Sequence, residues 1–344
     1  MVIPAYRCAQ YIAQGVASVF DQSFKNLELI VVNDGSPDTS LLESELERYR
    51  QKIRYLKQQS RGPSAARNAG IQEARGKYVA FLDGDDYWRP GHLSKLMTLF
   101  QQNSALELAY CDCILLKNEK LDARYFDLQA QAAVVNFDSI LVEDSAIPTS
   151  TVVASREALL GVGLFDESIR RCEDFDLWLR LAFQGAPMAY HTDAEVVHRV
   201  NDAGLSANSL AMKTDRIRVY QKAAETLPIT QKQRQTIQQI VAGIQAEGLV
   251  EKMKSALQAG DYRSARELAA QASKVYGNWK FSLAQFLLRA APSVLRQLYV
   301  ARAWLRRDSI ANQTSEEVPL PADCQDRNCA SASYSVDHHH AGER

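Results

Sequence analysis

Lys77–Asp86 reads KYVAFLDGDD, an apolar run of strand length that ends in a cluster of carboxylates. In open α/β folds, ligands bind beyond the carboxyl ends of the strands. Like charges repel one another, so packing alone gives no reason to gather Asp83, Asp85 and Asp86 there. A divalent cation that carries a phosphate does give one. The alternative interpretation is a charged turn that caps the helix expected after Pro90.

The sequence on both sides of this stretch alternates between strand and helix patterns. Strands are expected at Met1–Pro4, Leu27–Val32, Ile53–Lys57, Tyr78–Leu82 and Leu106–Leu115, and helices at Ala9–Phe20, Leu41–Arg50, Ser64–Ala74 and His92–Gln101. This alternation predicts an α/β fold with a mainly parallel sheet flanked by helices. No Gly-x-Gly-x-x-Gly follows the first strand and no Walker lysine loop is present, which argues against dinucleotide-binding and P-loop proteins.

Two further regions follow. Residues 137–206 mix strand and helix, and an amphipathic helix is expected at Cys172–Gln184, ended by Gly185 and Pro187. From Ser209 to Arg307 the pattern is helical, with one hairpin of tetratricopeptide type around residues 259–272. The polar remainder predicts a disordered tail. The expected domains are therefore an α/β domain at 1–206, an all-α C-terminal region at 207–307 and a tail at 308–344.

Composition narrows the class of protein. The chain has 344 residues, 24% of them charged, and a formal net charge of −1. This balance gives no support to nucleic-acid binding. No stretch approaches the roughly 18 continuous apolar residues of a membrane-spanning helix. The six cysteines show no disulfide framework and the start does not resemble a signal peptide, so a cytoplasmic location is expected.

Further polar residues stand at strand ends and helix starts, and each has a structural alternative. Tyr6 can stack on a base or simply pack. Asp34 follows a buried strand, where it can accept hydrogen bonds from a nucleobase or belong to an ordinary turn. Arg67 can bind a phosphate or be an ordinary surface arginine. Glu173 and Asp174 open a helix, where acids complement the macrodipole or supply a general base.

In their order and wording, five segments resemble the family 2 glycosyltransferases, enzymes of the GT-A fold that use nucleotide-sugar donors. The resemblance covers about residues 1–205, and its segments are Val2–Tyr6 (VIPAY), Val32–Ser36 (VNDGS), Gly62–Asn68 (GPSAARN), Phe81–Asp86 (FLDGDD) and Glu173–Trp178 (EDFDLW).

The resemblance implies a set of donor-binding residues. Pro4 and Tyr6 are expected to lie against the base, usually uracil, which Asp34 hydrogen-bonds. Arg67 is expected to contact the nucleotide, and Asp83 to hold its ribose side.

It also implies the catalytic groups. Asp85 is expected to ligate Mg²⁺ or Mn²⁺ bound to the diphosphate. Asp174 is expected to deprotonate the acceptor hydroxyl, with Glu173 beside it positioning the acceptor. Displacement at the anomeric carbon then inverts its configuration. The sequence departs from the family pattern at His198–Asn201 (HRVN), because Asn201 stands where a histidine usually contacts metal or diphosphate; His198, three residues earlier, is interpreted as structural.

The predicted function is an inverting, metal-dependent glycosyltransferase that moves a sugar from a nucleotide-sugar donor, expected to be UDP-linked, to an acceptor hydroxyl in surface polysaccharide or glycoconjugate assembly. The acceptor is a saccharide or lipid-linked. From Lys280 to Arg307 no acid occurs and arginines alternate with large apolar residues. This pattern suits either peripheral contact with the cytoplasmic membrane face or packing on the catalytic domain. The alternatives to the predicted function are a nucleotidyltransferase and a non-catalytic scaffold that uses the helical region.

Overall fold

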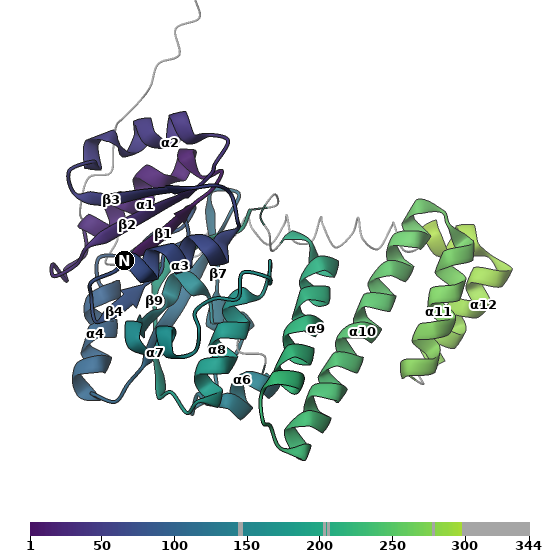
Figure 1. Ribbon diagram of the computed structural model, residues 1–344. Helices are drawn as coiled ribbons and strands as arrows, with labels where there is room; N and C mark the ends of the chain where they lie inside the picture. The colour runs from purple at the N-terminus through teal and green to yellow at the C-terminus, as the bar shows by residue number, and fades with distance from the viewer. Residues whose placement is uncertain (144–146, 202–203, 205–206, 277–278, 298–344) are drawn as a thin grey trace, which may run out of the picture. The chain divides into compact units, whose positions relative to one another are not determined.

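A computed structural model describes residues 1–143, 147–201, 204, 207–276 and 279–297 (Figure 1). The chain divides into two compact units, Met1–Glu251 and Lys252–Arg344. The predicted tail at 308–344 and the end of the basic stretch lie outside the described residues. None of the described helices is long and apolar enough to cross a membrane.

A three-stranded parallel sheet begins the first unit. Strands β1 (Val2–Ala5), β2 (Leu29–Asp34) and β3 (Ile53–Gln58) lie side by side in that order, with Ile3 opposite Val31 and Val31 opposite Tyr55. Helices α1 (Ala9–Phe20) and α2 (Thr39–Leu46) make the crossovers, the second with a short 3₁₀ turn, η1 (Glu47–Tyr49). All six residues of β2 are buried, as expected for a strand that is covered on both faces.

The second sheet is mixed, so the expectation of a mainly parallel sheet describes only the first. Its strand order is β4–β8–β6–β9–β5, and β7 pairs with β6. The strands are β4 (Tyr78–Ala80), β5 (Tyr87–Trp88), β6 (Leu108–Lys117), β7 (Lys120–Arg124), β8 (Val153–Ser155) and β9 (Met188–Arg199). Only the pairing of β6 with β9 is parallel. The two sheets meet where Val2 and Phe81 form a parallel bridge.

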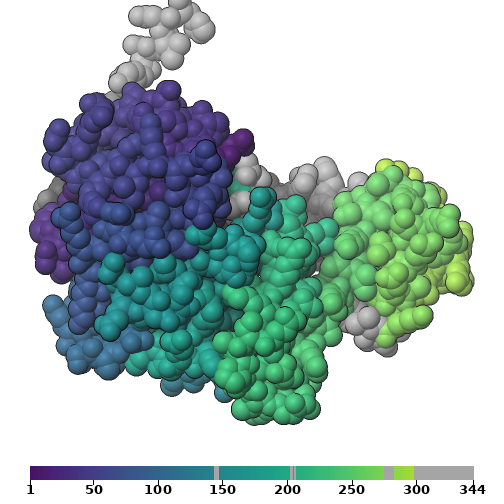
Figure 2. All heavy atoms as spheres, viewed as in Figure 1, coloured from purple at the N-terminus to yellow at the C-terminus, as the bar shows by residue number. Residues whose placement is uncertain are grey.

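Alternate residues of the central strands point to opposite faces of the sheet and belong to two separate hydrophobic cores. Val2, Ile30 and Phe81 face helices α3 (Pro63–Glu73) and α8 (Glu173–Phe183), whereas Ile3 and Val31 face α1, α2 and α4 (His92–Gln102). Helices therefore cover both faces of the sheet. Figure 2 shows the first hundred residues (purple and blue) and those around 150–200 (teal) as one continuous body.

The remaining described elements are mostly helical. In the first unit they are α5 (Tyr125–Leu128), α6 (Phe137–Glu143), a second 3₁₀ turn, η2 (Thr149–Thr151), α7 (Arg156–Gly161) and α9 (Ser209–Thr226). α10 (Gln231–Ala259) begins in the first unit and ends in the second, which also contains α11 (Tyr262–Tyr276) and α12 (Trp279–Ala290). The helical pattern predicted after Ser209 is confirmed as far as the described residues extend.

The close approach of α3 to β1 gives a stability prediction. A Cβ on Gly70 would lie 2.8 Å from Cγ2 of Val2, so Gly70→Ala should lower the free energy of unfolding by about 1–3 kcal/mol through overpacking. Gly243→Ala in α10 is the matched control. No atom lies within 4 Å of its added Cβ, so it should stabilise by about 0.5–1 kcal/mol. Urea unfolding measures both, and equal effects of the two changes would contradict the prediction.

Candidate active site

The Asp83–Asp86 turn lies at the junction of the two sheets. Leu82 leads into it and donates its backbone N–H to the carbonyl of Val2, 3.1 Å away. Gly84 is required by close approach, because a Cβ there would lie 2.6 Å from Sγ of Cys8 and 3.1 Å from the carbonyl oxygen of Pro4. The carboxylates are therefore held at the end of β1, as the sequence predicted for the sheet edge.

Asp86 anchors this turn from inside the protein. Its side chain is fully buried, and its Oδ2 accepts a hydrogen bond from Oγ of Ser150 at 2.6 Å and lies 2.8 Å from Nδ1 of His198. Its Oδ1 accepts the backbone N–H of Arg199 at 2.9 Å. The charge of Asp86 raises the pKa of His198 to about 9. Asp86 therefore ties the turn to η2 and to the end of β9.

Asp85 has a different environment. Among the described residues, no other side chain donates a hydrogen bond to its carboxylate, in contrast to Asp83 and Asp86. Burial, followed by the charges of Asp86 and Asp83, raises the pKa of Asp85 to about 7. A carboxylate in this position gains from any cation that approaches it, because the cation removes the repulsion.

Arg67 joins the turn to α8. Its guanidinium group donates through one terminal nitrogen to Oδ1 of Asp83 and through the other to Oε1 of Glu173, both at 2.7 Å. Only 4% of the residue is exposed, and the guanidinium carbon lies 5.3 Å from the ring centre of Phe165. Burial opposes its charge, but the two carboxylates outweigh burial and raise its pKa.

The first turn of α8 carries the two acids proposed from the sequence. Cys172 precedes them with φ of 59°, a left-handed conformation uncommon outside glycine and asparagine. Burial raises the pKa of Glu173 to about 6, against the opposing effect of Arg67. Burial also raises the pKa of Asp174, whose Oδ2 accepts a hydrogen bond from Oγ1 of Thr149 at 3.0 Å.

Asp34 is the most enclosed of the predicted donor residues. Only 2% of it is exposed, and its carboxylate accepts hydrogen bonds from the end of β3 and from the loop after it. The donors are Nε2 of Gln58 at 2.7 Å, Oγ of Ser60 at 3.3 Å and the backbone N–H groups of Arg61 at 2.9 Å and Gly62 at 2.8 Å. In this structure Asp34 organises the loop that leads into α3, and its hydrogen bond to a nucleobase stays a prediction.

Tyr6, which directly follows β1, is exposed to solvent. Of this large residue, 46% is exposed. The guanidinium carbon of Arg7 lies 5.6 Å from the centre of the Tyr6 ring. Arg7 itself has φ of 52° and donates its backbone N–H to Oγ of Ser36. The ring of Tyr6 is therefore exposed beside the end of β1, and its stacking on a base stays a prediction; Pro4, in that strand, is half-buried.

The structure thus brings Asp83 and Glu173 together through Arg67, and their roles toward donor and acceptor stay predictions. Thr149 and Ser150 could not be predicted from the sequence. His198, predicted to be structural, lies 2.8 Å from Asp86 in the carboxylate cluster. The only signal for His198 was its nearness to the family position. Thr149 and Ser150 carried none, because their contacts reach over more than twenty residues of sequence.

The carboxylate cluster fits a hard divalent cation by its chemistry. Its oxygen donors are the kind that Mg²⁺ and Mn²⁺ prefer, and Asp85 has a carboxylate that neither an ion pair nor another side chain's hydrogen bond occupies in the described structure. Within the described residues, no three acidic, histidine or cysteine side chains are already gathered as a metal cage. Sites of this kind, completed by substrate phosphates and water, are usual for Mg²⁺.

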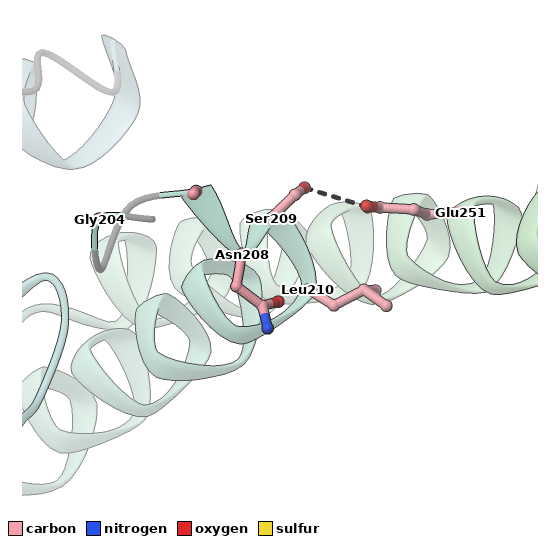
Figure 3. Close-up of a pocket in the computed structure, with 6 residues that line it drawn as sticks. Gly204, Asn208, Ser209, Leu210 and Glu251 are labelled. Carbon is pink, nitrogen blue, oxygen red and sulfur yellow. Dashed lines mark hydrogen bonds between the residues drawn. The ribbon is translucent and has the colours of Figure 1, made fainter. Parts of the chain in front are cut away.

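A separate hollow of about 450 Å³ lies where α9 begins, lined by Gly204, Ala207, Asn208, Ser209, Leu210 and Glu251. Figure 3 shows Ser209 bonded to Glu251 of α10, and the distance from Oγ to Oε2 is 3.1 Å. Lys213 also donates to Glu251 at 3.1 Å. These bonds hold α9 against α10, and none of the predicted site residues lines the hollow.

The buried arginine gives a second stability prediction. Arg67→Met keeps side-chain volume but leaves Glu173 and Asp83 unpaired, so it should cost about 3–5 kcal/mol of unfolding free energy. The loss should shrink as the pH is lowered, because protonation neutralises the unpaired Glu173. Arg50→Met is the control: its pair with Glu47 at 3.1 Å is largely exposed and should be worth less than about 1 kcal/mol. Thermal and urea unfolding measure both variants, and a pH-independent or negligible loss for Arg67→Met would contradict the assignment.

The N-terminal part of the chain is similar in sequence to known proteins. Residues 1–123 match the family model described as glycosyl transferase family 2. An uncharacterized glycosyltransferase of Rickettsia prowazekii is 27% identical over 218 residues, which are 61% of this chain and 66% of that protein. The minor teichoic acid biosynthesis protein GgaB of Bacillus subtilis is 35% identical over 107 residues, 30% of this chain and 12% of its own. The chain thus spans just under two thirds of the first relative and a small part of the second.

Solved structures extend the likeness to most of the fold. Residues 1–349 of S. aureus TarS, crystallised with UDP-GlcNAc, match with a TM-score of 0.57 over 88% of this chain and 90% of that one, at 16% identity. The mannosyltransferase PcManGT from Pyrobaculum calidifontis, in complex with GDP-Man and Mn²⁺, matches with a TM-score of 0.55 over 92% and 87%, also at 16% identity. These likenesses show a GT-A-type fold. The sequence similarity to family 2 glycosyltransferases covers residues 1–123 in the family model and 61% of the chain in the Rickettsia relative.

Proposed function

We propose that this protein transfers a sugar from a nucleotide-sugar donor, UDP-linked by preference, to an acceptor hydroxyl with inversion at the anomeric carbon. The observation that carries the proposal is the pair of 2.7 Å bonds from Arg67 to Asp83 and Glu173. They connect the turn assigned to the donor with the helix turn assigned to the acceptor. The fold match to TarS, crystallised with UDP-GlcNAc, supports the choice of donor class.

The acceptor side needs a base, since a sugar hydroxyl is a weak nucleophile. We assign this role to Asp174. Its carboxylate takes the hydroxyl proton as the acceptor oxygen bonds to the anomeric carbon, and the bond from that carbon to the diphosphate oxygen breaks with its electron pair on the leaving group. Burial raises the pKa of Asp174, which makes it a stronger base than an exposed aspartate. Glu173, held by Arg67, lies beside it to position the acceptor.

The donor side needs residues for base, ribose and diphosphate. We assign Tyr6 and Pro4 to the base, Asp34 to a hydrogen bond with it, Arg67 and Asp83 to the nucleotide, and Asp85 to a Mg²⁺ or Mn²⁺ ion. A bound divalent cation neutralises the diphosphate and so improves it as a leaving group. The unpaired carboxylate of Asp85 supports this assignment, as does the Mn²⁺ in the PcManGT structure.

The biological setting proposed is the assembly of a surface polysaccharide or glycoconjugate. It is supported by the similarity of 107 residues to GgaB, which is named as a teichoic acid biosynthesis protein. The acceptor is then a saccharide or a lipid-linked glycan.

Two substitutions separate donor binding from transfer. Asp85→Asn should lose UDP binding in the presence of Mn²⁺ and also transfer, because a cation held by Asp85 would neutralise the diphosphate in both the ground state and the transition state. Asp174→Asn should keep UDP affinity within a few-fold and lose transfer by about 10²-fold or more. Calorimetry with UDP, with and without a chelator, and release of nucleoside diphosphate from a panel of nucleotide sugars measure the two properties.

Each outcome has a distinct meaning. Equal UDP affinity with and without chelator would remove Asp85 from a metal role. Transfer by Asp174→Asn at the wild-type rate would reduce Asp174 to a helix-end acid, with Glu173 or Asp176 as the next candidate. Asp122→Asn is the matched control, because it makes the same change from aspartate to asparagine at an exposed position on strand β7. No nucleotide-sugar turnover by the wild type, with UDP still bound, would favour the non-catalytic alternative.

We also propose that the C-terminal unit makes peripheral contact with the cytoplasmic membrane face. On α12, Leu283 and Phe286 are three residues apart and so share one side, and 45% and 63% of them are exposed. Arg289 and Arg296 nearby are also exposed, and no acid occurs from 280 to 307. Exposed apolar residues flanked by cations are typical of helices that lie on anionic lipid.

Liposome sedimentation tests this contact in the full chain. Leu283→Ser combined with Phe286→Ser should lower binding to anionic phosphatidylglycerol vesicles by about tenfold or more, since each buried side chain is worth about 1.5–3 kcal/mol. UDP binding should not change. Val142→Ser, at a valine that is 60% exposed on α6, is the control. Binding of the wild type to neutral and anionic vesicles alike, or to neither, would contradict the proposal.

A further inference from the structure

The 3₁₀ turn η2 touches both halves of the carboxylate arrangement with two adjacent residues. Ser150 bonds to the Asp83–Asp86 turn, and Thr149 bonds to Asp174 on α8. None of the three segments is close to another in sequence. The Asp83–Asp86 turn, called the donor turn below, and the assigned base Asp174 are therefore linked through two adjacent residues of η2.

The hydroxyl group of Ser150 both donates and accepts a hydrogen bond. Oγ donates to Oδ2 of Asp86 at 2.6 Å and accepts the backbone N–H of Asp83 at 3.0 Å. Its carbonyl oxygen accepts Nε1–H of Trp88 at 2.8 Å. Only 1% of Ser150 is exposed, so no water replaces these bonds without rearrangement. Ser150 thus holds the start and the end of the turn that presents Asp85.

Thr149 acts on the acid of α8. Oγ1 donates to Oδ2 of Asp174 at 3.0 Å, while Oδ1 accepts the backbone N–H of Phe175 at 2.8 Å. A carboxylate otherwise rotates broadly about its last torsion. With one donor on each oxygen, rotation is restricted and a second lone pair on each oxygen stays free for an acceptor hydroxyl.

The turn itself is well supported. Thr151 donates its hydroxyl to the carbonyl of Pro148 at 2.7 Å and its backbone N–H to the same oxygen at 2.9 Å. One residue earlier, the carbonyl of Ile147 accepts Nε1–H of Trp178, at 3.2 Å. η2 continues directly into β8, which pairs with β4 and β6. Sheet and helix α8 therefore both fix its position.

We propose that η2 is a positioning element for the transfer reaction, in which Thr149 orients the Asp174 carboxylate and Ser150 holds the donor turn. This inference rests on the proposed function, because it takes Asp174 as the base. Neither hydroxyl is assigned a contact with substrate. Their effect is to keep the two reacting partners aligned, since small misplacements of catalytic groups are costly.

The charged surroundings of Asp174 determine what loss of the hydroxyl does. Arg67 from α3 favours its ionised form, whereas Asp83 from the donor turn opposes it. Glu173, Cys172 and Tyr125 of α5 are the other titratable groups that interact with it. All of these remain when the hydroxyl of Thr149 is removed. Because that hydroxyl bonds to the ionised form, its removal raises the pKa of Asp174.

The test follows the Asp174 carboxyl carbon by NMR in full-length protein labelled with ¹³C at aspartate Cγ, with Asp174→Asn to assign the signal. Thr149→Val should raise the midpoint of this titration by about 0.5–1 pH unit. Thr149→Ser, which keeps the hydroxyl, should restore the wild-type midpoint. Calorimetry should show unchanged UDP binding with Mn²⁺ in Thr149→Val, and Thr149→Ala should act like Thr149→Val if the valine disturbs folding.

Ser150→Ala gives the opposite pattern. UDP binding with Mn²⁺ should weaken by about 10- to 150-fold, the scale of one lost hydrogen bond to a charged group, and the Asp174 titration should stay in place. An unmoved Asp174 midpoint in Thr149→Val and Thr149→Ala, or full UDP affinity in Ser150→Ala, would overturn the inference. The titration needs no sugar donor, so it is independent of the proposed function, whose failure is read from transfer by Asp174→Asn.

Discussion

The double ion pair of Arg67 is the interaction on which the site depends. A guanidinium group that is 4% exposed has lost most of its hydration, and only well-placed carboxylates make up for that loss. Asp83 and Glu173 lie 16 and 106 residues away in sequence. Burying Arg67 therefore requires α3, the end of the β4 segment and the first turn of α8 to converge. The same convergence brings Asp174 toward the Asp83–Asp86 turn, so the fold and the candidate site share one electrostatic cause.

The acids of the site differ in how their charge is balanced, and this difference suggests their roles. Asp34 is balanced by backbone N–H groups and two side chains, and Asp86 by Ser150, His198 and the N–H of Arg199. Both therefore serve mainly to fix local structure. Asp85 has no comparable partner among the described residues, and burial, followed by the charges of Asp86 and Asp83, raises its pKa. A ligand that brings positive charge is the natural complement to this one position.

Local signals explain what could be predicted from the sequence. The strand that precedes Asp83 and the helix that carries Asp174 follow from their apolar residues and from charges at their ends. The hairpin of β6 and β7 could not be predicted, because its turn uses Asn118 and Glu119 at positive φ without a glycine, and that hairpin is one reason the second sheet is mixed. The roles of Thr149 and Ser150 were also hidden, since a hydroxyl gives no pattern until the fold brings its distant partner near.

Enclosure changes what the predicted donor residues can do. Both terminal nitrogens of Arg67 already donate to carboxylates, and Asp34 already accepts four hydrogen bonds, one from the end of β3 and three from the loop after it. A nucleotide that contacts either one must share or replace those bonds, which weakens the net gain from the contact. The exposed ring of Tyr6 and the unpaired carboxylate of Asp85 carry no such cost. Donor affinity in this arrangement is therefore expected to come chiefly from stacking and from the cation, while Arg67 and Asp34 keep the surrounding loops in shape.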